Sequence, residues 1–190
     1  GRAGELLAAS HGIEVRPARG PIRIDAGGRR LQLADGALEY TALVHALGAE
    51  TTPDPKIPPA PNVWRLRTLA DLEGIRGAVG PGGRVCVLGG SPTAVDAADA
   101  FRRGGYRVTI VQSDARLLAD FSEMGSARAL DALRASGVEV VLGDGPSGTE
   151  MAEGRVRAVA LASGATVAAD LVVVVMAGIM VFYIFLGCVM

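Results

Sequence analysis

Cysteine and aromatic residues are scarce in this chain, and neither sign of charge predominates. The two cysteines, Cys86 and Cys188, lie far apart and form no CxxC pair, which excludes a disulfide framework and a cysteine-based zinc site. This usage suits a reducing interior and predicts a cytoplasmic location. Cys86 lies within an apolar run and is expected to be a small buried core residue. Aromatic residues make up 4% of the chain and the net charge is −1, so we expect no partnership with nucleic acid.

The two ends of the chain differ from its body. The first residues, Gly1-Arg2-Ala3-Gly4, include no initiator Met and no signal-peptide pattern, so we expect the chain to begin part-way through a longer product. Residues 171–190 carry no charge, and this uncharged stretch is long enough for a membrane span. Three interpretations stay open for this end: a tail anchor, a buried strand followed by an atypical end, or a sequence altered by truncation or frameshift. The β-branched residues 171–175 favour a strand, with 176–190 as a separate hydrophobic tail.

Residues 1–50 have the pattern of a small β-meander that follows the end of a helix at residues 3–9. Four short strands are predicted there, at residues 13–15, 22–24, 31–33 and 41–47. Residues 51–62 carry five of the ten prolines of the chain, which is incompatible with a helix or a central strand. We interpret this segment as a stiff linker and a domain boundary.

Strands and helices alternate in residues 63–175. Helices are predicted at residues 68–77, 92–103 and 126–136. Strands are predicted at residues 84–88, 106–111, 138–142, 155–161, 165–168 and 171–175. Alternation of this kind with short connections indicates an α/β fold, in which a parallel sheet is covered on both faces.

The most informative segment joins the strand 84–88 to the helix 92–103 and reads Gly89-Gly90-Ser91-Pro92-Thr93-Ala94. A buried strand that enters a glycine turn and then a helix directs backbone N–H groups and the positive helix end at one point, which suits a dinucleotide pyrophosphate. Gly89 stands at the tight turn, whereas Ser91 and Ala94 take the second and third glycine positions of the fingerprint. An ordinary strand-to-helix turn would look similar. The βαβ context favours a Rossmann-like NAD(P)-binding domain, with residues 89–94 binding the cofactor.

The residue expected to bind the cofactor ribose is Gln112, at the end of the next strand. An acid usually stands there and accepts a hydrogen bond from the ribose 2′-OH. Gln112 can still bond a hydroxyl but adds no charge. Arg116 is the nearest candidate for a 2′-phosphate, or alternatively the partner of Asp114 in an ion pair. The predicted cofactor is therefore NAD(P)H, and NADH is favoured over NADPH.

Eight segments of the chain, in their order and spacing, resemble one family. They are residues 40–49, the Pro-rich segment, residues 66–71, the glycine turn, residues 107–111, Arg116-Leu117-Leu118, residues 137–140 and residues 169–173. The resemblance, over residues 5–175, is to the FAD-dependent pyridine nucleotide-disulfide oxidoreductases, and within them to the ferredoxin reductase-like branch. It implies an NAD(P)-binding domain (63–175) inserted into an FAD-binding domain, of which residues 1–50 would be the later part. It also implies hydride transfer from NAD(P)H to FAD and electron transfer onward to a redox protein.

Several departures from the family pattern favour an alternative. The glycine-rich fingerprint that binds FAD in the family is absent from this sequence. The Ala-Thr-Gly that lies beside the flavin in the family is replaced by Ala46-Leu47-Gly48. Val175-Met176-Ala177 replaces the small turn that would face the nicotinamide, and Asp96 stands where relatives often carry Glu. The alternative is a truncated or degenerate Rossmann-type domain without catalytic activity, with the tail as a membrane tether.

Neither histidine is expected to be catalytic. His11 is expected at a helix end and His45 in a packed strand, because neither has a Ser, Cys or carboxylate partner at a recognisable spacing. The sequence predicts no catalytic residue and no metal ligand, and the chemistry is left to bound cofactors.

Overall fold

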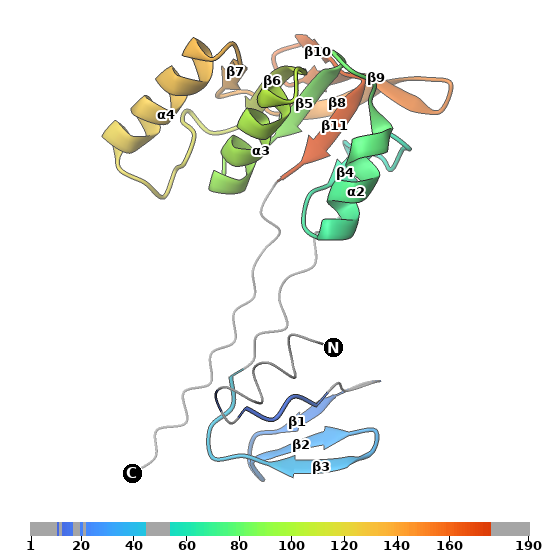
Figure 1. The fold of residues 1–190 in the computed structure, drawn as a ribbon, viewed down its shortest axis with the longest axis vertical. Helices are drawn as coiled ribbons and strands as arrows, with labels where there is room; N and C mark the ends of the chain where they lie inside the picture. Colours follow the sequence, from blue (N-terminus) through green and yellow to red (C-terminus); the bar gives the residue numbers. More distant parts are fainter. Residues whose placement is uncertain (1–10, 12, 17–19, 21, 45–53, 176–190) are drawn as a thin grey trace. The chain divides into compact units, whose positions relative to one another are not determined.

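The computed structural model describes residues 11, 13–16, 20, 22–44 and 54–175. The described residues fall into two compact units, one within residues 11–44 and one formed by residues 54–175. Figure 1 shows the helices α2–α4 and the strands β4–β11 in the larger unit, and the strands β1–β3 in the smaller one.

The smaller unit contains the predicted β-meander. Its strands β1 (Arg23–Asp25), β2 (Arg30–Leu33) and β3 (Gly36–Glu39) pair antiparallel in chain order. Arg30 and Glu39 face each other in the register of β2 and β3 and form an ion pair of 2.6 Å. The turn after β1 is closed by Asp25, whose carboxylate accepts from the backbone N–H of Gly28 at 2.8 Å. The strands predicted near residues 22–24 and 31–33 are confirmed.

Two other predictions for this unit are corrected. Residues 13–15 form no strand, and Ile13 and Val15 are about half exposed, so their apolar side chains do not mark a buried sheet face. Residues 41–44 form no strand either, and Val44 is 83% exposed. The strand in this region is β3, which lies earlier because it pairs with β2 through a tight turn. The helix expected at residues 3–9 and His45 lie outside the described residues, whereas His11 is exposed.

A five-stranded parallel sheet organises the larger unit. Its order is β4 (Val63–Arg65), β11 (Leu171–Val174), β5 (Arg84–Leu88), β6 (Arg107–Gln112) and β7 (Glu139–Leu142). The crossover helices are α2 (Leu69–Ala78), α3 (Pro92–Arg103) and α4 (Glu123–Ala135). An antiparallel sheet of β8 (Pro146–Ala152), β9 (Arg155–Leu161) and β10 (Thr166–Ala168) completes the unit. This arrangement confirms the predicted α/β fold.

Successive side chains of the central strands enter two different cores. Val85 and Val87 of β5 pack in one cluster with Ala94 and Ala98 of α3. Cys86 and Leu88, which alternate with them, pack in a second cluster with residues of β9. Helices therefore cover one face of the parallel sheet and the antiparallel sheet covers the other, which explains the continuous apolar runs of the central strands.

Cys86 behaves as the small core residue that its apolar neighbours predict. It is free, its exposed fraction is 0%, and burial raises the pKa of its thiol to about 12. The neutral thiol is therefore favoured at physiological pH, as is usual for a buried core cysteine.

Sequence reasoning missed two strands of the larger unit and misplaced one helix start. β4 is three residues long and directly follows the Pro-rich segment, whereas β8 contains Pro, Gly and Glu and shows no apolar alternation. The helix α4 begins at Glu123, three residues before the predicted start, because the Ser122 hydroxyl accepts from the backbone N–H of Gly125 at 3.2 Å and caps it.

The described part of the Pro-rich segment, residues 54–62, packs onto the larger unit. Ile57 is 1% exposed and belongs to the second cluster. The Asn62 side-chain amide donates to the carbonyls of Val156 (2.7 Å) and Asp170 (2.9 Å) and accepts from the N–H of Val156 (3.0 Å). Three hydrogen bonds thus fix the start of β4 against two neighbouring strands.

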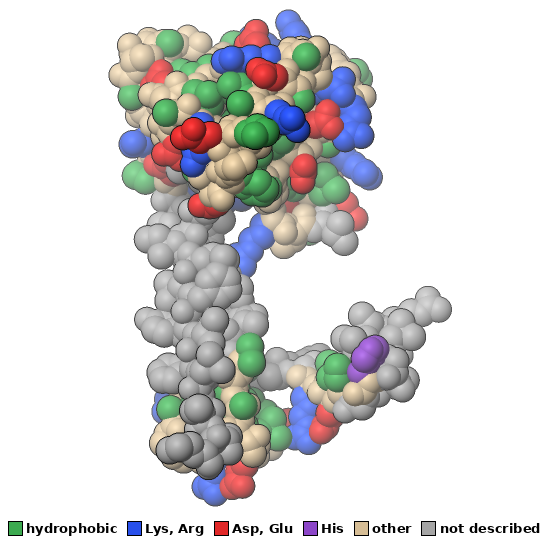
Figure 2. Space-filling model, turned by 90° about the vertical axis from the view of Figure 1, so that its left-hand side faces the viewer, with side chains coloured by type: hydrophobic (Ala, Val, Ile, Leu, Met, Phe, Trp, Pro, Cys, Tyr) green, Lys and Arg blue, Asp and Glu red, His purple; other side chains and the backbone are tan. Residues whose placement is uncertain are grey.

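At the C-terminal side of the unit, β11 confirms the strand predicted for the first part of the uncharged stretch. Residues 176–190 lie outside the described residues. Within the parts of the chain that the structure describes, no helix has the length and apolar character needed to cross a bilayer. On the face of the larger unit in Figure 2, side chains of both charge signs are interspersed among hydrophobic ones.

An ion pair joins the amino ends of β5 and β11. Asp170 accepts from the backbone N–H of Arg84 (2.9 Å) and from two nitrogens of its guanidinium (3.0 and 2.7 Å). The backbone N–H of Asp170 in turn donates to the Arg84 carbonyl at 2.9 Å. The hydrogen bonds from the Arg84 side chain are the main cause that lowers the pKa of Asp170 to about 2.

Replacement of Asp170 by Asn is expected to lower the free energy of unfolding near neutral pH by about 1 to 2 kcal/mol, a range reduced for the partial solvent exposure of the pair. The folded-state pKa lies below the ordinary value of 3.8, so this stabilisation is present above about pH 4 and is lost as the pH falls toward 2. Urea unfolding of the two proteins across this range should show their difference narrowing in acid. Glu153→Gln, at an 86% exposed carboxylate, is the matched control with little effect. A difference that stays constant down to pH 2 would contradict the prediction.

Candidate functional site

The turn between β5 and α3 depends on a backbone conformation that favours glycine. Gly89 has a φ of +120°, a region that residues with a side chain rarely adopt. Its N–H donates to the carbonyl of Val111 at 2.9 Å, which fastens the turn to the end of β6. The predicted role of Gly89 in a tight turn therefore matches its observed geometry.

Gly90 lets the end of β6 approach the turn closely. A Cβ atom at this position would lie 2.8 Å from Cδ and 2.9 Å from Cγ of Gln112, which is too close for any real side chain. The Gly90 carbonyl accepts from the N–H of Leu118 at 2.7 Å, so the loop after β6 is also fastened here. The turn thus leaves room for the Gln112 side chain and holds this loop through its own backbone.

The start of α3 has the features of a capped helix end. Ser91 is the N-cap, with extended backbone angles, and its hydroxyl accepts from the N–H of Ala94 at 3.4 Å. Pro92 occupies the first helical position, where its missing N–H costs no hydrogen bond. Ala94 is fully buried between helix and sheet, which explains why a small residue stands there. The first turn of α3 itself contains no acidic residue.

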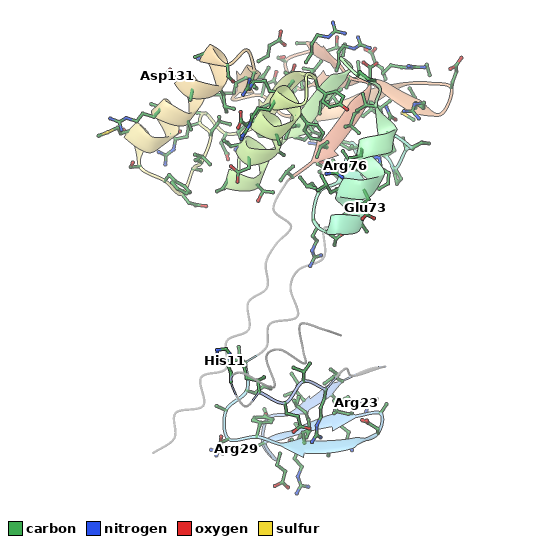
Figure 3. The ribbon with its side chains drawn as sticks, in the orientation of Figure 1. His11, Arg23, Arg29, Glu73, Arg76 and Asp131 are labelled. Carbon is green, nitrogen blue, oxygen red and sulfur yellow. The ribbon has the colours of Figure 1, made fainter. Side chains whose placement is uncertain are left out.

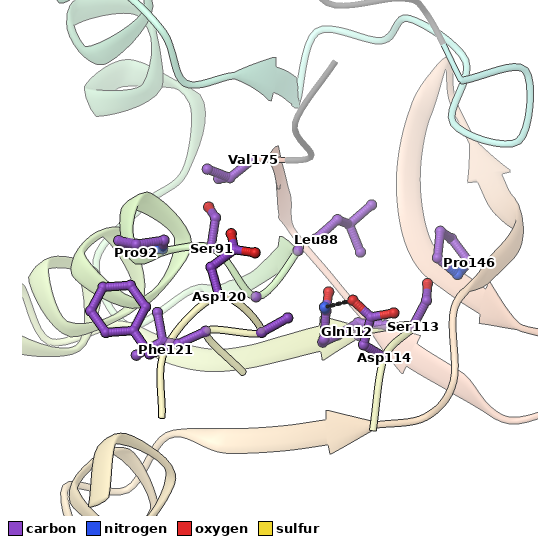
Figure 4. A pocket seen from close by; sticks show the side chains of 15 residues that line it. Leu88, Ser91, Pro92, Gln112, Ser113, Asp114, Asp120, Phe121, Pro146 and Val175 are labelled. Atoms are coloured by element: carbon purple, nitrogen blue, oxygen red, sulfur yellow. Dashed lines mark hydrogen bonds between the residues drawn. The ribbon is translucent and has the colours of Figure 1, made fainter. Parts of the chain in front are cut away.

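A pocket of about 320 Å³ lies at this helix start, outside the carboxyl ends of β5 and β6. This is where α/β sheets usually bind ligands. Its walls come from the turn, the end of β6, the loop that follows β6, and two further positions. The lining residues are Leu88, Gly89, Gly90, Ser91, Pro92, Val111, Gln112, Ser113, Asp114, Leu118, Ala119, Asp120, Phe121, Pro146 and Val175. Figure 4 shows Ser91, Pro92 and Asp120 on one side of the view, with Gln112 and Asp114 on the other.

The charged side chains among the described residues of the pocket are acidic. Positive partial charge comes only from backbone N–H groups. Asp114 and Asp120 are exposed, and no Lys or Arg is among the described residues that line the pocket. An anionic group bound here would therefore depend on backbone N–H groups and on the start of α3.

The predicted site residues separate into two groups. Gly89, Gly90, Ser91, Pro92 and Gln112 line the pocket, whereas Thr93, Ala94 and Arg116 are not among its described lining residues. Their joint assignment to cofactor binding stays a prediction.

Of the two alternatives for Arg116, the ion pair with Asp114 is not formed. The Arg116 guanidinium donates instead to the carbonyls of Ala119 (2.6 Å) and Phe121 (3.4 Å). It therefore shapes the loop that borders the pocket. The partner of Asp114 is Gln112, whose Nε2 donates to Oδ2 of Asp114 at 2.6 Å.

Sequence reasoning missed the pocket residues that come from loops. Asp114 could have been found, since it is a carboxylate two residues beyond the end of β6. The loop residues 118–121, Pro146 and Val175 carry no motif, because only the tertiary fold brings them to the glycine turn.

Comparisons with known proteins identify one family. The family model described as pyridine nucleotide-disulphide oxidoreductase matches residues 3–179. Rhodocoxin reductase of Rhodococcus erythropolis is 32% identical over 168 residues, which cover 86% of this chain and 39% of the relative. Putidaredoxin reductase of Pseudomonas putida is 32% identical over 149 residues, which cover 74% and 35%.

Two solved structures of reductases are also similar to this chain. A ferredoxin reductase from Rhodopseudomonas palustris superposes with a TM-score of 0.77 and 30% identity over 91% of this chain and 43% of its own. The reductase of a covalent putidaredoxin reductase–putidaredoxin complex gives a TM-score of 0.71 and 30% identity over 82% and 40%. The chain thus spans less than half the length of the relatives that it matches.

Gly89→Ala is expected to destabilise the larger unit by about 1 to 3 kcal/mol, because a Cβ atom is strained at this φ. Gly77→Ala is the matched control: it lies in the exposed last turn of α2 with no atom within 4 Å of the added Cβ. It should stabilise the protein by about 0.5 to 1 kcal/mol. Urea unfolding followed by circular dichroism measures both, and equal stability of Gly89→Ala and the wild type would refute the role of the turn.

Proposed function

Because the chain belongs to the pyridine nucleotide-disulphide oxidoreductase family, we propose that residues 54–175 bind the NAD(P)H of a flavin-dependent reductase. The observation that carries the proposal is the pocket at the start of α3, where the glycine turn and the helix end meet. Its volume of about 320 Å³ lies in the range of small-molecule sites.

In this proposal the backbone of residues 89–91 and the start of α3 hold the cofactor pyrophosphate. The conformation of Gly89 and the absence of a Cβ at Gly90 keep main-chain atoms at the surface of the pocket. The helix dipole favours a negative group there. Gln112 and its neighbours at the end of β6 would then face the adenosine ribose.

When bound, the nicotinamide cofactor supplies a hydride and the FAD of the complete enzyme accepts it. The residues of this chain bind and orient the cofactor, which needs no acid–base group of their own. The smaller unit, with β1–β3, is proposed to be the later part of the FAD-binding domain. Residues 46–48, expected beside the flavin, lie outside the described residues.

A redox protein is the proposed electron acceptor. The names of the relatives, rhodocoxin reductase and putidaredoxin reductase, support this assignment. One of the similar structures is itself a complex of a reductase with putidaredoxin. A cytoplasmic location, expected from the cysteine usage, is part of the same proposal.

The alternative of a degenerate domain without activity is not favoured. One argument for it is that Ser91 stands at the second glycine position of the fingerprint. The Ser91 hydroxyl, however, turns back to the N–H of Ala94 as a helix cap. The substitution therefore gives α3 a capped start.

The proposal predicts that the 190-residue chain binds NADH and that Ser91→Asp weakens this binding at least about ten-fold, since the added carboxylate repels the pyrophosphate. Asp and Asn are both good N-caps, so Ser91→Asp and the matched control Ser91→Asn should fold equally well. Isothermal titration calorimetry with NADH and NADPH measures the binding, and circular dichroism measures the folding.

Ser91→Asn should retain most of the wild-type affinity. A wild-type chain that binds neither nucleotide, or two variants with equal affinity, would refute the proposed pyrophosphate site.

A further inference from the structure

One wall of the pocket at the start of α3 is the loop that follows β6. Residues 118–121 line the pocket, and Arg116 precedes them in the chain. We propose that Arg116 is a positioning residue, which holds this loop in the shape that nucleotide binding requires by bonding the loop backbone rather than the nucleotide. This inference rests on the proposed nucleotide site.

The Arg116 side chain is bonded to the backbone of its own loop. Nη2 donates to the carbonyl of Ala119 at 2.6 Å, and Nη1 donates to the carbonyl of Phe121 at 3.4 Å, the weaker contact of the two. Because the guanidinium is planar and rigid, it ties these two points together. Among the described residues, no other hydrogen-bond donor reaches either carbonyl. Residues 119–121, the loop tip, therefore depend on this one side chain.

Leu118, next to the loop tip, has a backbone conformation that a bulky residue rarely adopts. Its φ is +50°, in the left-handed region. A strained residue of this kind persists only where the surrounding contacts determine its conformation. Its N–H donates to the carbonyl of Gly90 at 2.7 Å, and its carbonyl accepts from the N–H of Phe121 at 2.8 Å. The loop is thus held in a shape that it would leave if these contacts were weakened.

Both ends of the loop are anchored to the rest of the larger unit. Leu117 has an exposed fraction of 0% and belongs to the cluster that packs β5 against α3. Its carbonyl accepts from the buried hydroxyl of Ser126 in α4 at 2.6 Å. At the other end, Ser122 caps α4. The loop tip between these anchors is exposed, so loss of the Arg116 side chain is expected to loosen the tip and leave the fold intact.

A pocket wall that is formed in advance favours binding. A ligand that must order a loop loses affinity, whereas a preformed pocket avoids this cost. Figure 4 shows Asp120 and Phe121 of the loop on the same side of the view as Ser91 and Pro92 of the helix start. The loop tip therefore borders the position proposed for the pyrophosphate. Without Arg116, a nucleotide would have to order this wall itself.

Arg116→Gln tests this inference in the ligand-free 190-residue chain by amide hydrogen exchange. The amides of Leu118 and Phe121 should exchange at least about five-fold faster than in the wild type, because local opening of the loop becomes easier. Exchange at Ile110, in the buried part of β6, should not change. Arg76→Gln is the matched control, at an exposed arginine on α2 outside the pocket (Figure 3), and should change none of these rates.

Calorimetric titration with NADH measures the effect on binding. Arg116→Gln should bind NADH at least about five-fold more weakly than the wild type and Arg76→Gln do. The ratio of the wild-type affinity to that of Arg116→Gln should be the same at low and at high salt, because Arg116 acts through the loop backbone. A guanidinium that contacts the pyrophosphate directly would give a ratio that falls toward one as salt screens its charge.

The possible outcomes separate this inference from the proposed function. Unchanged exchange at Leu118 and Phe121, or a similar rise at Ile110, would overturn the local positioning role of Arg116. Faster exchange at the loop with unchanged NADH affinity, or a loss of affinity that disappears at high salt, would overturn its role in binding while the nucleotide site stands. A wild type that binds neither NADH nor NADPH would refute the nucleotide site itself, and the exchange rates would still decide whether Arg116 holds the loop.

Discussion

The backbone conformation of Gly89 is the constraint on which the candidate site depends. At Gly89, with a φ of +120°, the chain leaves β5, and three residues later α3 begins at the carboxyl end of the sheet. The N–H of Gly89 and the carbonyl of Gly90 are used to fasten β6 and the following loop. Both walls of the pocket are therefore positioned by the main chain of one turn. Side chains complete the pocket but do not determine where it lies.

The two ends of β5 have different surroundings: an ion pair at the amino end and the pocket at the carboxyl end. At its amino end, Arg84 pairs with Asp170 and satisfies the polar groups where two parallel strands begin. At its carboxyl end, the helix dipole and the acidic side chains of the pocket are close to solvent. Between them, Val85 and Val87 face the helices, while Cys86 and Leu88 face the antiparallel sheet. The ion pair stabilises the amino end of β5 and the two hydrophobic clusters stabilise its middle. The carboxyl end of β5 is left open for a ligand.

Much of the larger unit could be predicted because its signals are local. The apolar run of β5 and the Ser91-Pro92 start of α3 gave the observed bounds of both elements. β8 could not be predicted, since its pairing with β9 compensates for a sequence that contains Pro and Gly. In the site, the glycine turn and Gln112 were found from spacing. The loop 118–121 was not found, because a hydrogen bond from Leu118 to Gly90 places it, and the spacing of residues does not encode such a contact.

Ser91 illustrates how a turn of this kind can form without a glycine at its third position. Its side chain bends back onto its own helix, so the surface offered to a ligand is still peptide backbone, as it would be with glycine. The shape of this turn depends on backbone torsion angles, which more than one residue type can adopt at position 91. A sequence pattern defined by residue types will therefore miss turns of this kind, whereas a search by backbone geometry would find them.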